Sequence, residues 1–148
     1  AIVLGVAETS FEGQGPMCLE ACARPVSEFP SLPIAADAEG LLRIDWAPLL
    51  EYCNDHLRSA ADRAGAVHAA LADAIGRITE AERSRSGVTV VGLTGGVFQN
   101  RLLLESAAAR LEQSGFRVLL PVRIPCNDGG LSYGQVAEHV GRTAATAP

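Results

Sequence analysis

The chain has 148 residues, a formal net charge of −5 and 48% hydrophobic residues, which suits one domain with a buried core. It contains no Lys/Arg-rich run, so its charge does not favour a nucleic-acid partner. The first residues lack a charged segment and soon meet Glu8 and Glu12, which excludes a signal peptide and a membrane-spanning helix. We therefore expect a cytoplasmic protein that makes no membrane contact.

The first residue is Ala1 and not an initiator Met, so we expect residues 1–148 to be a single domain cut from a longer polypeptide. The cysteines form no C-x-x-C pair, and an Ala-rich chain of this size does not need disulfides, so reduced thiols are expected. Cys18 and Cys22 lie one helical turn apart, a spacing that could bind a metal. No further ligand stands nearby, which favours small buried side chains.

The first half of the chain predicts short elements before a long helix. In order they are an apolar run over 2–7 (a truncated strand or a helix end), a helix over 17–23, a connection over 25–40, a strand over 41–44 and a helix over 45–53. Pro16 suits the first turn of its helix, and Asp45 is the expected N-cap of the other.

A long amphipathic helix is predicted over 58–83. Its apolar face comprises Ala64, Val67, His68, Leu71, Ile75 and Ile78. His68 falls inside this face. With no carboxylate fixed beside it in sequence, a hydrogen-bonded core histidine is favoured over a metal or catalytic histidine.

The central pattern of the chain runs from Val88 to Asn100: a buried strand over 88–93, a Gly95-Gly96 turn and the start of a helix. Glycines let the backbone approach a ligand closely, and the first amides of a helix offer free N–H groups at its positive end. The Asn100 amide offers a donor and an acceptor to a ribose or base edge. The alternative is that the glycines serve helix packing alone.

The elements after Asn100 complete a β-α-β unit. A helix ends at Gly115, a strand over 116–120 follows, and the two strands should be parallel neighbours. A last helix is predicted over 131–141, with a frayed tail over 142–148.

A second polar turn, 127–130, has the sequence Asn-Asp-Gly-Gly. An Asp before a helix is ordinarily a cap. However, neighbouring parallel strands end at one crevice, so Gly95, Gly96, Asn100 and Asp128 should converge. Asp128 would then be a ligand for Mg²⁺ or a transition metal near nucleotide phosphates.

Several motifs together resemble one protein family. They are the segments Leu-Thr-Gly-Gly-Val-Phe-Gln-Asn-Arg-Leu-Leu-Leu-Glu (93–105), Gly-Phe-Arg-Val-Leu (115–119), Pro-Cys-Asn-Asp-Gly-Gly-Leu-Ser-Tyr-Gly-Gln (125–135), Phe-Glu-Gly-Gln (11–14) with Met17, Leu19 and Glu20, and Leu-Arg-Ile-Asp-Trp-Ala-Pro-Leu (42–49). These resemble the C-terminal end of HypF, the carbamoyltransferase of [NiFe]-hydrogenase maturation. Thr94, Gly15-Pro16 and Cys126 depart from the usual family residues.

The resemblance implies an α/β fold: one lobe of an actin-like/ribonuclease-H-like domain related to the threonylcarbamoyl transferases, with a mixed sheet and flanking helices. It implies that ATP with Mg²⁺ and carbamoyl phosphate give carbamoyl-adenylate, whose carbamoyl group passes to the C-terminal cysteine of HypE. Glu12 and Gly13 match the ribose side of the nucleotide site. Asp128 matches one ligand of a divalent metal, Fe or Zn, while the family's His-x-x-x-His pair is absent here.

We therefore expect nucleotide binding at Glu12, Gly13, Gly95, Gly96 and Asn100 and metal binding at Asp128, with no catalytic residue assigned. The isolated chain is expected to be inactive. The alternatives are a lobe of an O-carbamoyltransferase of secondary metabolism, which shares the fold, and a non-catalytic module that docks a partner.

Overall fold

The computed structural model describes residues 1, 3–5 and 11–145. Its elements are α1 (Gln14–Cys22), β1 (Ile34–Ala36), β2 (Leu42–Ile44), α2 (Ala47–Asn54), α3 (Ala60–Ser86), β3 (Val90–Gly92), the 3₁₀ helix η1 (Gly96–Gln99), α4 (Arg101–Gln113), β4 (Arg117–Leu119), the 3₁₀ helix η2 (Asp128–Gly130) and α5 (Leu131–Ala145). Of the apolar run expected over 2–7, residues 3–5 form a turn and the rest lies outside the described residues.

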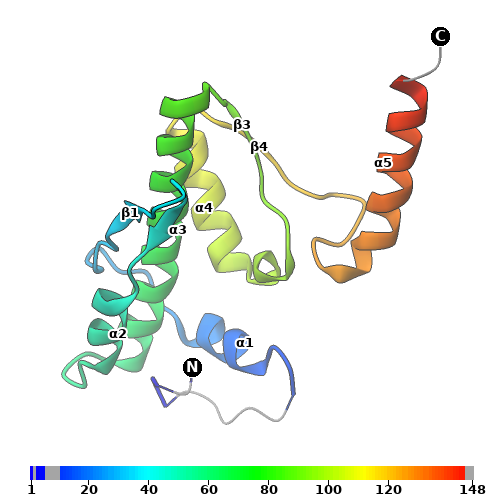
Figure 1. Cartoon of the computed structure of the whole chain (residues 1–148). Helices are drawn as coiled ribbons and strands as arrows, with labels where there is room; N and C mark the ends of the chain where they lie inside the picture. The colour runs from blue at the N-terminus through cyan, green and yellow to red at the C-terminus, as the bar shows by residue number, and fades with distance from the viewer. Residues whose placement is uncertain (2, 6–10, 146–148) are drawn as a thin grey trace.

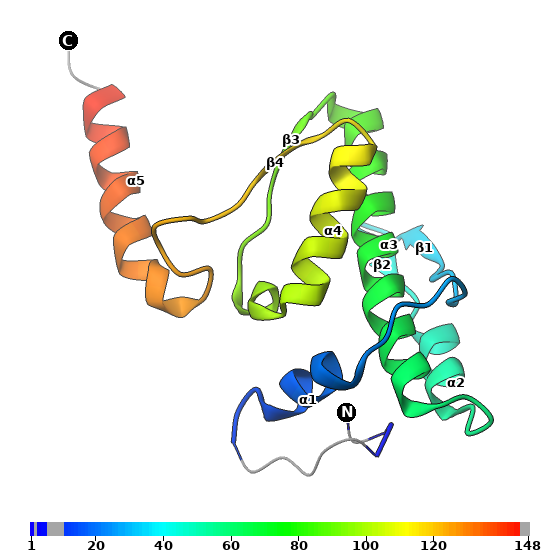
Figure 2. The same cartoon turned by 180° about the vertical axis from the view of Figure 1, so that it is seen from behind.

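The long helix α3 is the centre of the fold, with α2 and β1–β2 on one side and α4 with β3–β4 on the other, while α1 lies below α4 (Figures 1 and 2). One hydrophobic cluster includes Leu32, Leu49 and Ala70. The other includes Ala72 and Leu111. Because α3 contributes buried alanines to both clusters, it joins two cores that would otherwise be separate.

The ends of α3 follow ordinary capping rules. The Ser59 side chain accepts a hydrogen bond from the Asp62 backbone N–H at the start, and Gly87, with φ of 73°, ends the helix in the left-handed conformation. Within the helix, Gly65 lies directly under the chain near Arg24. A Cβ added there would lie 2.0 Å from the Arg24 carbonyl oxygen. The packing of the chain near Arg24 therefore requires a glycine at position 65.

The strands form two separate sheets. The hairpin β1–β2 is antiparallel, with Ile34 opposite Ile44. β2 confirms the predicted strand, whereas β1 falls in the stretch expected to be connection. It was missed because it is short and Ala-rich, and Ala has low β propensity. Asp37 holds the turn: it accepts from the Leu41 N–H at 2.8 Å and pairs with Arg43, which lowers the pKa of its carboxyl group.

β3 and β4 are parallel, with Val90 opposite Arg117 and Gly92 opposite Leu119. This confirms the β-α-β unit, and Gly115 adopts a φ of 80° as expected after a helix end. The prediction that the strand over 88–93 is buried was wrong for most of it, although Leu93 at its end is buried. Val90 is 42% exposed, because α3 and α4 cover only one face of this two-stranded sheet.

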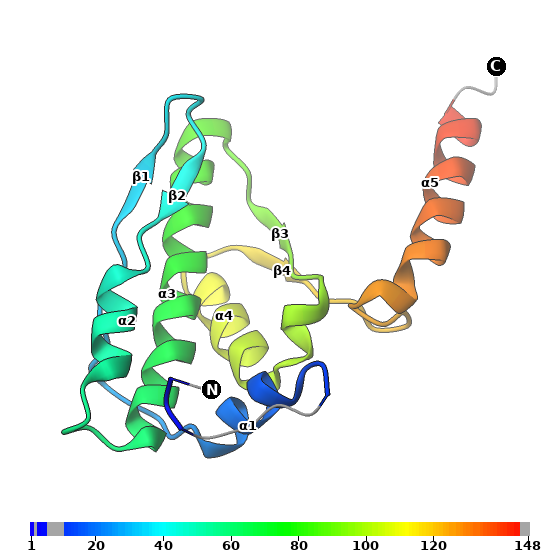
Figure 3. The same ribbon diagram turned by 60° about the horizontal axis from the view of Figure 1, so that its bottom comes forward.

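The last helix, α5, extends away from the body (Figures 1 and 3). All residues from Leu131 to Thr143 are exposed. The tail was expected to fray from residue 142. This prediction was wrong for residues 142–145, because α5 continues to Ala145. No helix in the described part of the chain is long and apolar enough to cross a membrane.

The close approach at Gly65 gives a direct test of the packing. We predict that Gly65→Ala lowers the free energy of unfolding by about 2 kcal/mol, because the new Cβ would overlap the Arg24 carbonyl. The control is Gly141→Ala, also in a helix but with nothing within 4 Å of an added Cβ, which should not destabilise the chain. Equal denaturation midpoints for both variants would contradict this account of α3.

Candidate functional site

The loops that follow β3 and β4 meet, as the parallel-strand argument predicted. Gly95 has φ of 104°, a conformation that L side chains rarely adopt, and its N–H donates to the Cys126 carbonyl at 2.6 Å. Cys126 lies two residues before Asp128. The glycine turn and the second polar turn are therefore joined by a hydrogen bond.

Gly96 lacks the structural reason that its neighbour has. Its φ is not positive, and a Cβ added to it would meet no atom within 4 Å. Within the described residues, no protein group accepts a hydrogen bond from the Gly96 or Val97 N–H. Packing within this chain does not require a glycine at 96, which leaves open space and two donors at the surface.

The second glycine pair is different. A Cβ on Gly130 would lie 2.7 Å from the Pro125 carbonyl oxygen, and one on Gly129 would lie 3.1 Å from Asn127 Oδ1. These two glycines let the chain fold tightly at η2. Packing within the chain therefore explains why positions 129 and 130 are glycine, whereas it does not explain the glycine at position 96.

The start of the helix after the glycine turn differs from the prediction. η1 intervenes, and α4 begins only at Arg101, with Asn100 as its N-cap. Two of its first amides are already bonded: Leu103 N–H donates to Asn100 Oδ1 and Leu102 N–H to Glu20 Oε1, both at 2.9 Å. The expectation of free amides at this helix end was therefore wrong for these two groups.

Glu20 comes from α1, which lies beside the start of α4 (Figure 3). Its carboxylate stabilises the positive end of α4 and ties the N-terminal helix to the site. Sequence reasoning did not predict this contact, because nothing in the spacing of residues 20 and 102 links them. Arg101 pairs with Glu105 on the same helix, which raises the pKa of its guanidinium.

Asn100 has a second fixed partner. His68, only 2% exposed, places Nε2 at 2.8 Å from Asn100 Nδ2, while its Nδ1 lies 2.8 Å from the Ala64 carbonyl oxygen. The prediction of a hydrogen-bonded core histidine is confirmed. The partner on α4 was missed, since only the packing of α3 on α4 brings the two together.

Asp128 is exposed, and its carboxylate has no hydrogen-bond or ion-pair partner among the described residues. The alternative that it caps the helix is not what the structure shows. Asn127 is the N-cap of η2, accepting from the Gly129 N–H at 3.0 Å. No three His, Cys, Asp or Glu side chains gather closely enough to bind a metal in the part of the chain that the structure describes. The described residues therefore do not provide a complete metal site by themselves.

Glu12 and Gly13 lie just before α1. Glu12 is exposed, and Gly13, with φ of 86°, is the N-cap residue of that helix. The structure gives a backbone reason for Gly13 and leaves the Glu12 side chain at the surface. Their predicted place on the ribose side of a nucleotide stays a prediction.

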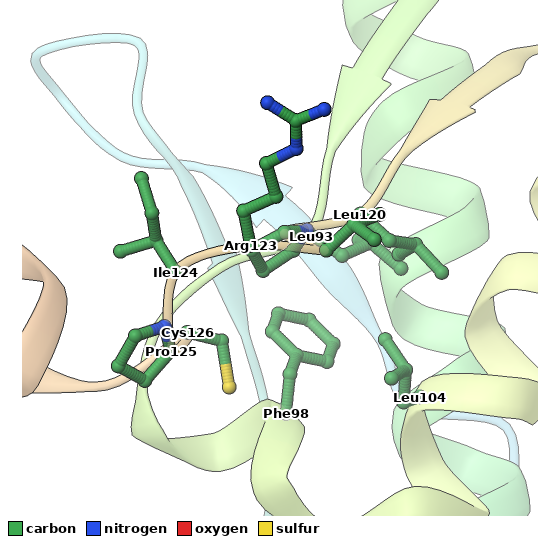
Figure 4. Close-up of a pocket in the computed structure, with 10 residues that line it drawn as sticks. Leu93, Phe98, Leu104, Leu120, Arg123, Ile124, Pro125 and Cys126 are labelled. Atoms are coloured by element: carbon green, nitrogen blue, oxygen red, sulfur yellow. The ribbon is translucent and has the colours of Figure 1, made fainter.

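An apolar cavity of about 540 Å³ adjoins the glycine turn (Figure 4). Leu93 precedes the turn and Phe98 follows it, Leu104 lies beside Phe98, and the loop 120–126 forms the other side. In Figure 4 the Arg123 side chain points away from Phe98 and Leu104. The mostly apolar lining suits an aromatic or aliphatic group, and Arg123 adds a charged residue to it.

Comparison with known proteins shows to which class of domain this chain belongs. Residues 1–135 match the family model described as "Carbamoyltransferase, Kae1-like Domain, second subdomain". The chain also superposes on the crystal structure of full-length HypF in the phosphate- and nucleotide-bound form, with a TM-score of 0.83 and 32% identity over 89% of this chain. For the structure of T. kodakarensis HypF the TM-score is 0.78 at 26% identity. The mixed α/β fold is thus that of a Kae1-like subdomain.

The chain belongs to the HypF carbamoyltransferase family. It is 36% identical over 131 residues to the carbamoyltransferase HypF of Synechocystis sp. and 38% identical over 134 residues to that of Rhodobacter capsulatus. These matches cover 87% and 85% of this chain but only 17% and 16% of those proteins. The chain therefore spans about a sixth of the length of these relatives.

Proposed function

We propose that, within a full-length HypF protein, this chain forms one side of the cleft in which a carbamoyl group passes from carbamoyl-adenylate to the C-terminal cysteine of HypE, on the way to the hydrogenase cyanide ligands. In that step the thiolate attacks the carbamoyl carbon, a C–S bond forms, the bond to the phosphate oxygen breaks and AMP leaves. Membership in a family of named carbamoyltransferases supports this proposal. It also favours HypE-directed transfer over the O-carbamoyltransferase alternative.

The main structural support for this proposal is the surroundings of Gly96. The open space above it and the donors at Gly96 and Val97 suit the close approach of an anionic oxygen, such as a phosphate of ATP or of the adenylate. A related HypF structure was determined in a phosphate- and nucleotide-bound form. Glu12, Gly13 and Asn100 would complete the nucleotide contacts. ATP would bind with Mg²⁺ in the full-length protein.

Asp128 is proposed as one ligand of a divalent metal, Fe or Zn. Its free, exposed carboxylate fits that role, and the remaining ligands would come from outside this chain. Since the described residues do not provide the rest of a metal site, we propose that the isolated chain does not transfer carbamoyl groups.

The glycine turn is tested with Gly96→Val in the full-length protein. We expect the affinity for ATP to fall by about tenfold or more, because a branched side chain would occupy the space that the nucleotide approaches. Gly92→Val is the matched control: it also adds a side chain with no atom within 4 Å of the Cβ, in a strand where Val is favoured. Unchanged ATP affinity in a folded Gly96→Val protein would overturn the proposed role of the turn.

Asp128 is tested with Asp128→Asn. The melting temperature should stay near that of the wild type, because Asn127 and not Asp128 caps η2. Bound metal, measured by elemental analysis of the full-length protein, and carbamoyl transfer to HypE should both be lost, since the amide lacks the charge that a cation favours. A variant with stoichiometric metal and normal transfer would show that Asp128 is not a ligand.

A further inference from the structure

His68 and Asn100 form a chain of hydrogen bonds that joins α3 to the start of α4. The Ala64 carbonyl and His68 Nδ1 are 2.8 Å apart, His68 Nε2 and Asn100 Nδ2 are 2.8 Å apart, and Asn100 Oδ1 accepts from Leu103 N–H. Every link has the length of an ordinary hydrogen bond. His68 is buried and Asn100 half-buried, so water competes little at the inner end.

The chemistry of the outer groups fixes the state of the imidazole. A carbonyl oxygen can only accept, so His68 Nδ1 must carry a proton to bond to Ala64. The neutral ring then leaves Nε2 as an acceptor, which matches the Asn100 amide nitrogen facing it. A second proton on Nε2 would place donor against donor.

The orientation of the Asn100 amide is fixed from the other side as well. The Leu103 backbone N–H can only donate, so the atom that faces it must be the Asn100 oxygen. Both ends thus require the same amide orientation. One N–H and one oxygen lone pair of the amide remain, and these are what Asn100 can offer a ligand.

We propose that His68 is a positioning residue for the nucleotide site: as the neutral, Nδ1-protonated tautomer it holds the Asn100 amide in the orientation that presents its remaining donor and acceptor to the ligand. The role rests on the proposed function, since Asn100 is one of its nucleotide-binding residues. His68 itself is buried behind Asn100 and acts through it. Without His68, the cap bond to Leu103 remains, but the amide is held at only one end.

The test compares His68→Gln with His68→Leu. A Gln side chain can place its amide oxygen near the position of Nε2 and accept from Asn100, whereas Leu fills similar volume and accepts nothing. In two-dimensional ¹H–¹⁵N spectra of this chain, the Asn100 side-chain amide signals should stay near their wild-type positions in the Gln variant and shift in the Leu variant. In the full-length protein, the Kd for ATP should rise by about tenfold with Leu and stay close to the wild-type value with Gln.

Wild-type protein provides a readout that needs no variant. Long-range ¹H–¹⁵N spectra of histidine-labelled chain should show His68 protonated at Nδ1 and bare at Nε2. The opposite tautomer, or Asn100 signals that do not respond to Leu, would overturn the proposal even if a variant failed to fold. If the Asn100 signals respond as expected but wild-type full-length protein does not bind ATP, the proposed function fails and the positioning of Asn100 stands.

Discussion

The close packing of α3 on both of its sides is the constraint on which the rest of the structure depends. Its buried alanines enter two hydrophobic clusters, and Gly65 leaves room for the backbone near Arg24. Small side chains let neighbouring segments approach the helix axis closely, and larger ones would separate the two cores. The Ala-rich composition of this helix is therefore a packing requirement as well as a helix-forming preference.

The same packing sets the position of the candidate site. α4 lies along α3, and the buried carboxylate of Asp73 pairs with Arg110 across the helix interface and with Arg77 on its own helix. At the other end of α4, the His68 ring bonds to the Asn100 amide, and the Glu20 carboxylate accepts from the Leu102 N–H. The first turn of α4 is held from two helices, while Gly96 and Val97, a few residues earlier, stay open to solvent.

The sequence predicted most of the architecture because its strongest signals are local. The long helix, the β-α-β unit and the glycine at the end of α4 follow from periodicity and from turn chemistry. β1 was missed because three residues, two of them Ala, carry little strand signal. The exposure of β3 depends on which face of the sheet packs against a helix, and the exposure of α5 depends on whether another segment covers it. The sequence of the segment itself determines neither exposure.

For the site, the sequence and its family resemblance predicted Gly95, Gly96, Asn100 and Asp128, and the structure joins the two turns through Gly95 and Cys126. The sequence did not predict that η1, which begins at Gly96, would lie between Gly95 and α4, or that Glu20 and Asn100 would accept from the first amides of α4. Glu20 on α1 and His68 on α3 both bond to the start of α4, at Leu102 and Asn100. Such contacts depend on tertiary packing.

The central claim is that the open amides of the glycine turn receive a nucleotide. Hydrogen–deuterium exchange of the full-length protein, with and without a non-hydrolysable ATP analogue, tests it directly. The peptide covering residues 94–100 contains the Gly96 and Val97 amides, which have no protein acceptor in the described part of the chain. The account predicts that the analogue slows exchange in this peptide. Unchanged exchange at saturating analogue, with protection elsewhere in the protein, would contradict it.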